Sequence, residues 1–256
     1  MLNFTIFKAT APRDMPPLLI AHGLFGSGRN WSVIARRLAD SRDVITVDMR
    51  NHGDSPRFAS QSYPEMADDL AQVIEAHGSS ADVLGHSMGG KAAMVLALSN
   101  STLVRRLVVA DIAPVAYYHD QKQYVAAMAR LDLRGLTNRA DADQRLAESI
   151  DDPALRAFFL QSLNLRVTPP GWRLNLAVLN TEMPKIIGWP GTSGQYGSRA
   201  LFLYGGQSTY VLPEHRALIL NQFTNAYFAR IPGAGHWLHA EKPREFEETV
   251  RIFLNA

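Results

Sequence analysis

Four short apolar runs in the first half of the chain limit its possible folds more than any other feature. They are rich in branched residues, and each is followed at once by Gly, His or Asp, as expected of strands buried in a parallel sheet. Helix-like stretches lie between them, among them residues 31–38 and 63–74. Strands that alternate with helices predict an α/β fold, with a mostly parallel sheet covered by helices on both faces. The four runs are Leu18–Ala21, Val44–Val47, Ala81–Leu84 and Leu107–Ala110.

The alternation of strands and helices stops after the fourth run. From about residue 115 to residue 195, the sequence shows mainly helical spacing of apolar side chains and breaker-rich loops such as "VTPPGW". Strand-like runs return at 200–204 and 226–231, and a helix-like stretch closes the chain. We therefore predict one sheet domain, formed by residues 1–114 and 196–256, into which residues 115–195 are inserted as a helical lid.

A serine lies at the turn between the third apolar run and the helix-like stretch that follows it. Gly85 and Gly89 flank Ser87 in the pattern Gly-x-Ser-x-Gly, which places a nucleophilic serine at a strained strand-to-helix turn. Small residues are needed on both sides, since strand and helix approach each other closely there. We predict that Ser87 is a catalytic nucleophile; the alternative is a glycine-rich turn in which the serine is incidental.

A serine nucleophile needs a base that takes its proton near neutral pH. His236, in "IPGAGHWLHAEKP", follows the last strand-like run and precedes the final helix, in a loop that can reach the turn at Ser87. We predict that His236 is the base. His239, three residues further on, is the alternative.

Two backbone N–H groups are needed to stabilise the negative oxygen of an ester under attack. One is predicted to come from Met88, the residue after the nucleophile. The other is predicted to come from the loop "HGLFGS", where Gly23 lets the backbone turn inward and Leu24 carries the donor. Phe25 is the alternative donor, and the His22 side chain is expected to shape the loop through hydrogen bonds.

The acidic partner of the histidine has two candidates. In proteins with this serine turn, the chain order is serine, acid, histidine, and the acid usually lies after the strand at 200–204. That loop, "GGQST", contains no carboxylate. Asp111 ends the preceding strand-like run and can approach the histidine from the neighbouring position, so we assign it the orienting role. Glu214 is the alternative acid, and a cap on the first inserted helix is the alternative role of Asp111.

The composition narrows the possible partners. A net charge of +2 without a long Lys or Arg cluster argues against nucleic acid binding, and the absence of cysteine excludes disulfides and thiolate chemistry. The longest apolar stretches are far shorter than the roughly 20 residues that span a membrane. We expect a soluble, cytoplasmic monomer or small homo-oligomer without a membrane span, which needs no metal and no organic cofactor.

Five blocks carry most of the recognisable motifs of the chain: "HGLFGS", "VDMRNHGDSP", "GHSMGGKA", "DIAPV" and "GAGHWLHAEKP". Together, and in this order, they resemble the bacterial YbfF-type esterases of the α/β-hydrolase fold. The resemblance covers nearly the whole chain and is least visible in residues 115–195. It implies a serine esterase that acts on small-molecule substrates, namely short acyl esters and acyl-CoA thioesters, with its acid at Asp111.

Two other activities remain open, because one fold hosts many chemistries. A cofactor-free perhydrolase or haloperoxidase uses the same three side chains. A receptor-like protein keeps them but turns over its ligand slowly. Epoxide and haloalkane hydrolases need an aspartate at the turn, so the serine argues against both.

The insertion contains more large apolar side chains than a thin surface layer needs. An insertion after the strand of Asp111 lies over the carboxyl edge of the sheet, where ligands bind, so we predict that it covers an acyl pocket. The alternative is that its apolar side chains form only its own core. The predicted pocket residues are Phe25, Phe158, Phe159 and Trp189.

Overall fold

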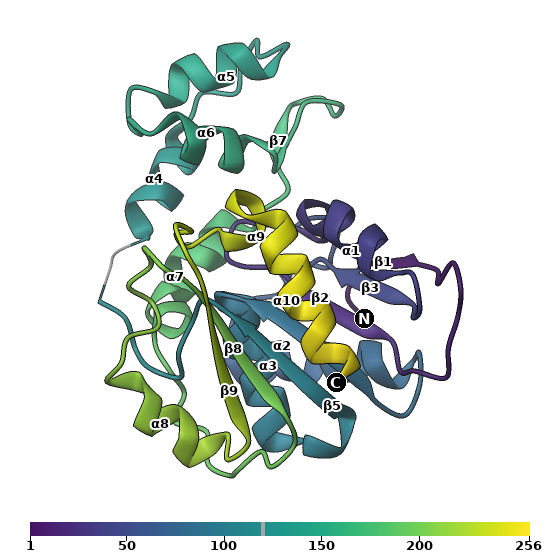
Figure 1. Cartoon of the computed structure of the whole chain (residues 1–256). Coiled ribbons are helices and arrows are strands. Elements are labelled where there is room, and N and C mark those ends of the chain that lie inside the picture. The colour runs from purple at the N-terminus through teal and green to yellow at the C-terminus, as the bar shows by residue number, and fades with distance from the viewer. Residues whose placement is uncertain (119–120) are drawn as a thin grey trace.

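The computed structural model describes residues 1–118 and 121–256. Its strands are β1 Phe4–Phe7, β2 Leu18–Ala21, β3 Val44–Val47, β4 Ala81–His86, β5 Val104–Ala110, β6 Leu163–Asn164, β7 Gly171–Trp172, β8 Ala200–Gly205 and β9 Ala226–Ile231. Within the described part of the chain, a sheet of seven strands has the order β1-β3-β2-β4-β5-β8-β9 (Figure 1). Neighbouring strands are parallel except β1, which is antiparallel to β3. This sheet confirms the predicted α/β class.

All six strand-like runs of the sequence form strands of this sheet. Three are longer than predicted, since β4 continues to His86, β5 begins at Val104 and β8 continues to Gly205. The sequence analysis missed β1. This strand has four residues, lies at the edge of the sheet and has an exposed Thr5, so it lacks the continuous apolar run of a buried strand.

Helices cover both faces of the sheet (Figure 1). They are η1 Gly28–Trp31, α1 Ser32–Leu38, α2 Tyr63–Glu75, α3 Met88–Ser99, η2 Ser101–Leu103, α8 His215–Gln222, α9 Leu238–Glu241 and α10 Pro243–Asn255. Successive side chains of a strand point to opposite faces. Leu19 accordingly belongs to the cluster of α2, α3 and α8, and Leu18 to the cluster of α1 and α10. Among the described residues, no helix is both long and apolar enough to cross a membrane.

The helices and strands between β5 and β8 belong to what we call the inserted segment, residues 115–195. They are α4 Lys122–Arg130, α5 Arg139–Leu146, α6 Pro153–Leu160, the antiparallel pair β6–β7, and α7 Leu176–Ile187. In Figure 1, α4, α5, α6 and β7 stand above the main body, whereas α7 lies alongside it. Residues 119 and 120, which fall in the predicted insertion, lie outside the described residues.

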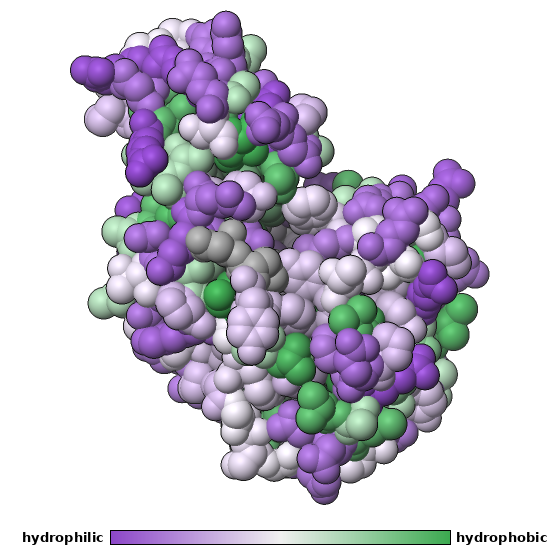
Figure 2. All heavy atoms as spheres, turned by 90° about the vertical axis from the view of Figure 1, so that its left-hand side faces the viewer, coloured by the Kyte–Doolittle hydropathy of each residue, from purple (hydrophilic) through white to green (hydrophobic). Residues whose placement is uncertain are grey.

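Polar side chains connect the inserted segment to the main body. Arg173, just after β7, forms an ion pair with Asp54 in which Nη1 lies 2.5 Å from Oδ1. The amide of Asn30 in η1 donates a hydrogen bond of 2.5 Å to Gln161, just after α6. Figure 2 shows that the surface is hollowed where the projecting part meets the body. The inserted segment thus borders a recess near the carboxyl ends of the strands.

Candidate active site

Ser87 lies at a sharp turn between β4 and α3. Its backbone has φ 52° and ψ −117°, a strained conformation for a residue with a side chain. A Cβ atom on Gly85 would lie 2.3 Å from the carbonyl oxygen of Gly89, and one on Gly89 would lie 2.4 Å from that of Ala21. Neither position tolerates a side chain, so the two glycines are required by the close approach of strand and helix.

The imidazole of His236 lies against Ser87. His236 is in the loop between β9 and α9, and its Nε2 is 3.1 Å from Ser87 Oγ. The ring of Tyr210 stacks on it with centroids 3.9 Å apart, and His86 Nε2 donates to the backbone carbonyl of His236. His239 is not in this position: its ring stacks on Trp31, and burial lowers its pKa to about 3.

Asp111 is fully buried at the end of β5, and its carboxylate faces the other ring nitrogen of His236. Asp111 Oδ2 is 2.7 Å from His236 Nδ1. The same carboxylate accepts the backbone N–H of Gly205 at 3.0 Å and the hydroxyl of Ser208 at 2.5 Å. The structure therefore brings Asp111 to the histidine. The alternative acid, Glu214, is exposed at the start of α8.

The alternative role of Asp111, a cap on the first inserted helix, does not agree with the structure. The residue at the N-cap of α4 is Gln121.

Because the Asp111 carboxylate accepts from Nδ1–H, the Nε2 lone pair of His236 faces the Ser87 hydroxyl. This arrangement can remove a proton from the serine and make its oxygen a nucleophile.

The loop after β2 passes directly against Ser87. A Cβ atom on Gly23 would lie 3.3 Å from Ser87 Cβ. The Phe25 N–H, the alternative oxyanion donor, is already bound to His52 Nε2 at 3.2 Å. Within the described residues, the amides of Leu24 and Met88 donate to no other group. The two predicted oxyanion donors are therefore not engaged by another group of the described chain.

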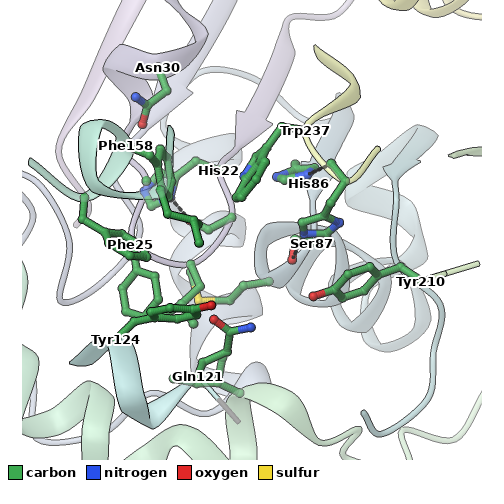
Figure 3. A pocket seen from close by; sticks show the side chains of 18 of the residues that line it. His22, Phe25, Asn30, His86, Ser87, Gln121, Tyr124, Phe158, Tyr210 and Trp237 are labelled. Carbon is green, nitrogen blue, oxygen red and sulfur yellow. Dashed lines mark hydrogen bonds between the residues drawn. The ribbon is translucent and has the colours of Figure 1, made fainter. Parts of the chain in front are cut away.

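A cavity of about 240 Å³ opens beside Ser87. Figure 3 shows Ser87 and Tyr210 on one side of it and Phe25, Tyr124 and Phe158 across from them. Residues from the main body and from α6 and α7 line the cavity together, among them Leu24, Phe25, Met88, Phe158, Phe159 and Ile187.

The prediction of Trp189 as a pocket residue is wrong, because Trp189 is not among the residues that line this cavity. It follows α7, beyond the point where Ile187 and Gly188 are hydrogen-bonded to the main body, and its side chain packs on the large core cluster instead. The abundance of large apolar residues in the insertion identified a half-buried side chain but not its neighbours.

Two residues of the site were missed by the sequence analysis. Tyr210 stacks on His236, but it follows the loop in which only a carboxylate was sought. Lys91 of α3 is buried beside the cavity, and its Nζ donates to the carbonyls of Ile187 and Gly188 at 3.0 and 2.5 Å. Burial lowers the pKa of Lys91 to about 7. A lone lysine within the apolar sequence of α3 was the available signal.

No cluster of three or more His, Cys, Asp or Glu side chains in the described ranges is arranged to hold a metal ion. Several histidines do lie near Ser87. His236 is bound to Asp111 and Ser87, whereas His86 Nε2 is bound to the His236 carbonyl and His22 Nδ1 to the Gly23 carbonyl.

Comparison with known proteins places these observations in a family context. Residues 16–243 match a family model described as alpha/beta hydrolase fold. The chain is 38% identical to the esterase YbfF of Escherichia coli (strain K12), over 99% of both proteins. It is 39% identical to the sn-1-specific diacylglycerol lipase ABHD11 of Mus musculus, over 99% of this chain and 85% of that protein. A solved structure, a marine microorganism esterase, is similar with a TM-score of 0.92 and 35% identity, covering 98% of each chain.

Proposed function

The chain belongs to the α/β-hydrolase family and is a carboxylic ester hydrolase, and we propose that it is a serine esterase for short-chain carboxylic esters. The observation that carries this proposal is the hydrogen-bonded triad of Ser87, His236 and Asp111 beside a cavity. Such a triad activates a serine for attack on an ester carbonyl.

In the proposed reaction, Ser87 Oγ attacks the carbonyl carbon while His236 Nε2 takes the hydroxyl proton. The carbonyl oxygen becomes negative and accepts hydrogen bonds from the Leu24 and Met88 amides. When the tetrahedral intermediate collapses, the C–O bond to the alcohol breaks, and His236 gives its proton to the leaving oxygen. Water then attacks the acyl-serine with His236 again as base, which releases the acid and restores Ser87. Asp111 stabilises the imidazolium in both steps.

The size of the cavity supports a short acyl chain. Its volume of about 240 Å³ lies below the roughly 300–1,000 Å³ that is usual for drug-sized ligands. Aromatic rings close the side opposite Ser87, with Phe25 and Phe159 packed edge to face at 5.2 Å. An acyl-CoA thioester fits the same chemistry, with a thiol as the leaving group, and we include it in the proposal.

A hydrolysis screen tests this proposal. Nitrophenyl esters of increasing acyl length, matched acyl-CoAs and a diacylglycerol emulsion should be compared by kcat/KM. We expect steady turnover with the highest values for short acyl esters. A burst of product without steady turnover would instead favour the receptor-like alternative, and oxidation of a halide or acid only with added peroxide would favour the perhydrolase.

We also propose that the inserted segment, residues 115–195, acts as a lid that limits acyl length. Phe158 lines the cavity from α6 and packs near Trp237, with ring centroids 6.0 Å apart. Phe158→Ala should raise kcat/KM for an octanoate ester relative to a butyrate ester by roughly tenfold, since each methylene in such a pocket is worth roughly 1–3 kcal/mol. Phe159 is fully buried, and Phe159→Leu removes less side-chain volume than Phe158→Ala. It should shift the ratio of octanoate to butyrate kcat/KM in the same direction.

Trp189→Ala is the matched control for this prediction. It also truncates a large aromatic residue of the inserted segment, but at a position that does not line the cavity. The ratio of octanoate to butyrate hydrolysis should stay at the wild-type value. An unchanged ratio in both phenylalanine variants, with folded proteins by circular dichroism, would show that the segment does not set acyl length.

A further inference from the structure

The loop that carries Leu24 has a conformation that needs an external restraint. Phe25 has φ 65°, which is uncommon for a bulky side chain and costs conformational energy. Its N–H is held by His52 Nε2 at 3.2 Å. Two residues earlier, the Gly23 carbonyl accepts from His22 Nδ1 at 2.7 Å and from the Gly26 N–H at 3.1 Å. The backbone is therefore fixed on both sides of Leu24.

The bond to the Gly23 carbonyl also sets the direction of the Leu24 amide. The Gly23 C=O and the Leu24 N–H belong to the same planar trans peptide and point in opposite directions. A hydrogen bond that holds the carbonyl on one side thus aims the N–H to the other. On the far side of Leu24, the bond from Phe25 to His52 prevents the next peptide from turning and removes Phe25 as a competing donor.

The partners of the two histidines fix their protonation. His52 Nδ1 faces the Arg50 carbonyl at 2.8 Å and must donate, which leaves Nε2 as the acceptor for Phe25. His22 Nε2 likewise accepts the Met49 N–H at 2.9 Å. Burial lowers the pKa of His52 to about 3. The ring therefore stays neutral, and its acceptor nitrogen stays available, across the working pH range.

We propose that His52, supported by His22, is a positioning residue of the oxyanion hole. His52 lies in the turn after β3, outside the Ser87–His236–Asp111 triad, and acts through the backbone of Phe25. The same bond orients the Phe25 side chain, whose ring packs on Phe159 in the cavity wall. One side chain thereby sets both an oxyanion donor and a wall of the acyl pocket. This inference rests on the proposed serine esterase function.

Two substitutions separate positioning from simple stability. His52→Asn keeps a donor near the Arg50 carbonyl but cannot reach Phe25, whereas His52→Gln places an amide oxygen near the position of Nε2. We expect His52→Asn to lower kcat by about 10–100-fold, less than the full loss of an oxyanion donor, with KM nearly unchanged. It should weaken inhibition by an alkyl boronic acid, which forms a tetrahedral adduct with the serine, by a similar factor. His52→Gln should retain most of the wild-type kcat and most of the wild-type affinity for the boronic acid.

Asp69→Asn is the matched control. It breaks the buried ion pair with Arg50, whose Nε lies 2.6 Å from Asp69 Oδ2, and so weakens the same turn without touching the oxyanion loop. It should lower the melting temperature but leave kcat and boronate affinity near wild type. Equal losses of kcat in His52→Asn, His52→Gln and Asp69→Asn would overturn the proposal, as would a loss confined to KM.

A measurement on the wild-type protein does not depend on activity. In ¹⁵N-labelled protein, a scalar coupling across the hydrogen bond should connect the Phe25 amide nitrogen with His52 Nε2. Its absence would overturn the positioning role, even if no variant folded. A wild-type protein with this coupling but without ester turnover would contradict the proposed function instead, so the two failures can be told apart.

Discussion

Ser87→Ala should lower the turnover of ester substrates by a factor on the order of a million, as expected when a serine nucleophile is lost. The fold should remain intact, because alanine keeps the Cβ atom and adds no strain at φ 52°. The hydroxyl removed donates only within the site, to His236. Hydrolysis of a nitrophenyl acetate, measured alongside the circular dichroism spectrum and the melting temperature, checks both parts of this expectation.

Ser99→Ala is the control for this variant. Ser99 lies at the other end of α3, and within the described residues its hydroxyl donates only to backbone carbonyls of its own helix. Its loss should leave turnover unchanged. If Ser87→Ala kept activity within about tenfold of wild type, Ser87 could not be a nucleophile whose loss costs this much, and the proposed reaction would be wrong.

The sheet could be predicted from the sequence because parallel strands that are buried on both faces have continuous runs of apolar residues with branched side chains. β3, with four buried residues, is such a run and was placed with its correct bounds. β1 could not be found in this way. Its register against β3 depends on partners 37 to 43 residues away, and its half-buried or exposed residues carry no distinctive pattern.

The candidate site was predictable to the extent that chain order constrains it. The glycines around Ser87 and the position of His236 after the last strand are local signals, and the missing carboxylate after β8 left Asp111 as the nearest acid. The structure places these three side chains together. The contact between Phe25 and His52, by contrast, joins segments 27 residues apart, and neither segment shows it alone.

The pocket was the least predictable part. Phe158 and Trp189 are both large apolar residues of the inserted segment, but only Phe158 lines the cavity. The difference arises from the C-terminal end of α7, where Lys91 and Tyr117 bind the carbonyl of Ile187 and fix the chain before Trp189. Tertiary hydrogen bonds of this kind have no periodic signature in the sequence.

Asp111→Asn should lower turnover by a factor on the order of 10⁴, as in triads where the wrong histidine tautomer is imposed. The Asp111 carboxylate accepts three hydrogen bonds, from Gly205, Ser208 and His236. The asparagine amide has one acceptor oxygen, and its NH₂ group cannot face a protonated Nδ1. An NH₂ group beside Nδ1 favours the His236 tautomer that carries its proton on Nε2. In that tautomer, Nε2 cannot accept the proton of Ser87.

The loss in Asp111→Asn should come from this tautomer rather than from the backbone. Asp111 has φ 52°, and asparagine is one of the few residues that adopt this region readily. The variant should therefore fold with a normal circular dichroism spectrum. Glu214→Gln, at an exposed site before α8, should keep wild-type turnover. If Glu214→Gln lost activity while Asp111→Asn kept it, the acid would be Glu214, and its loop would have to move to reach His236 during the reaction.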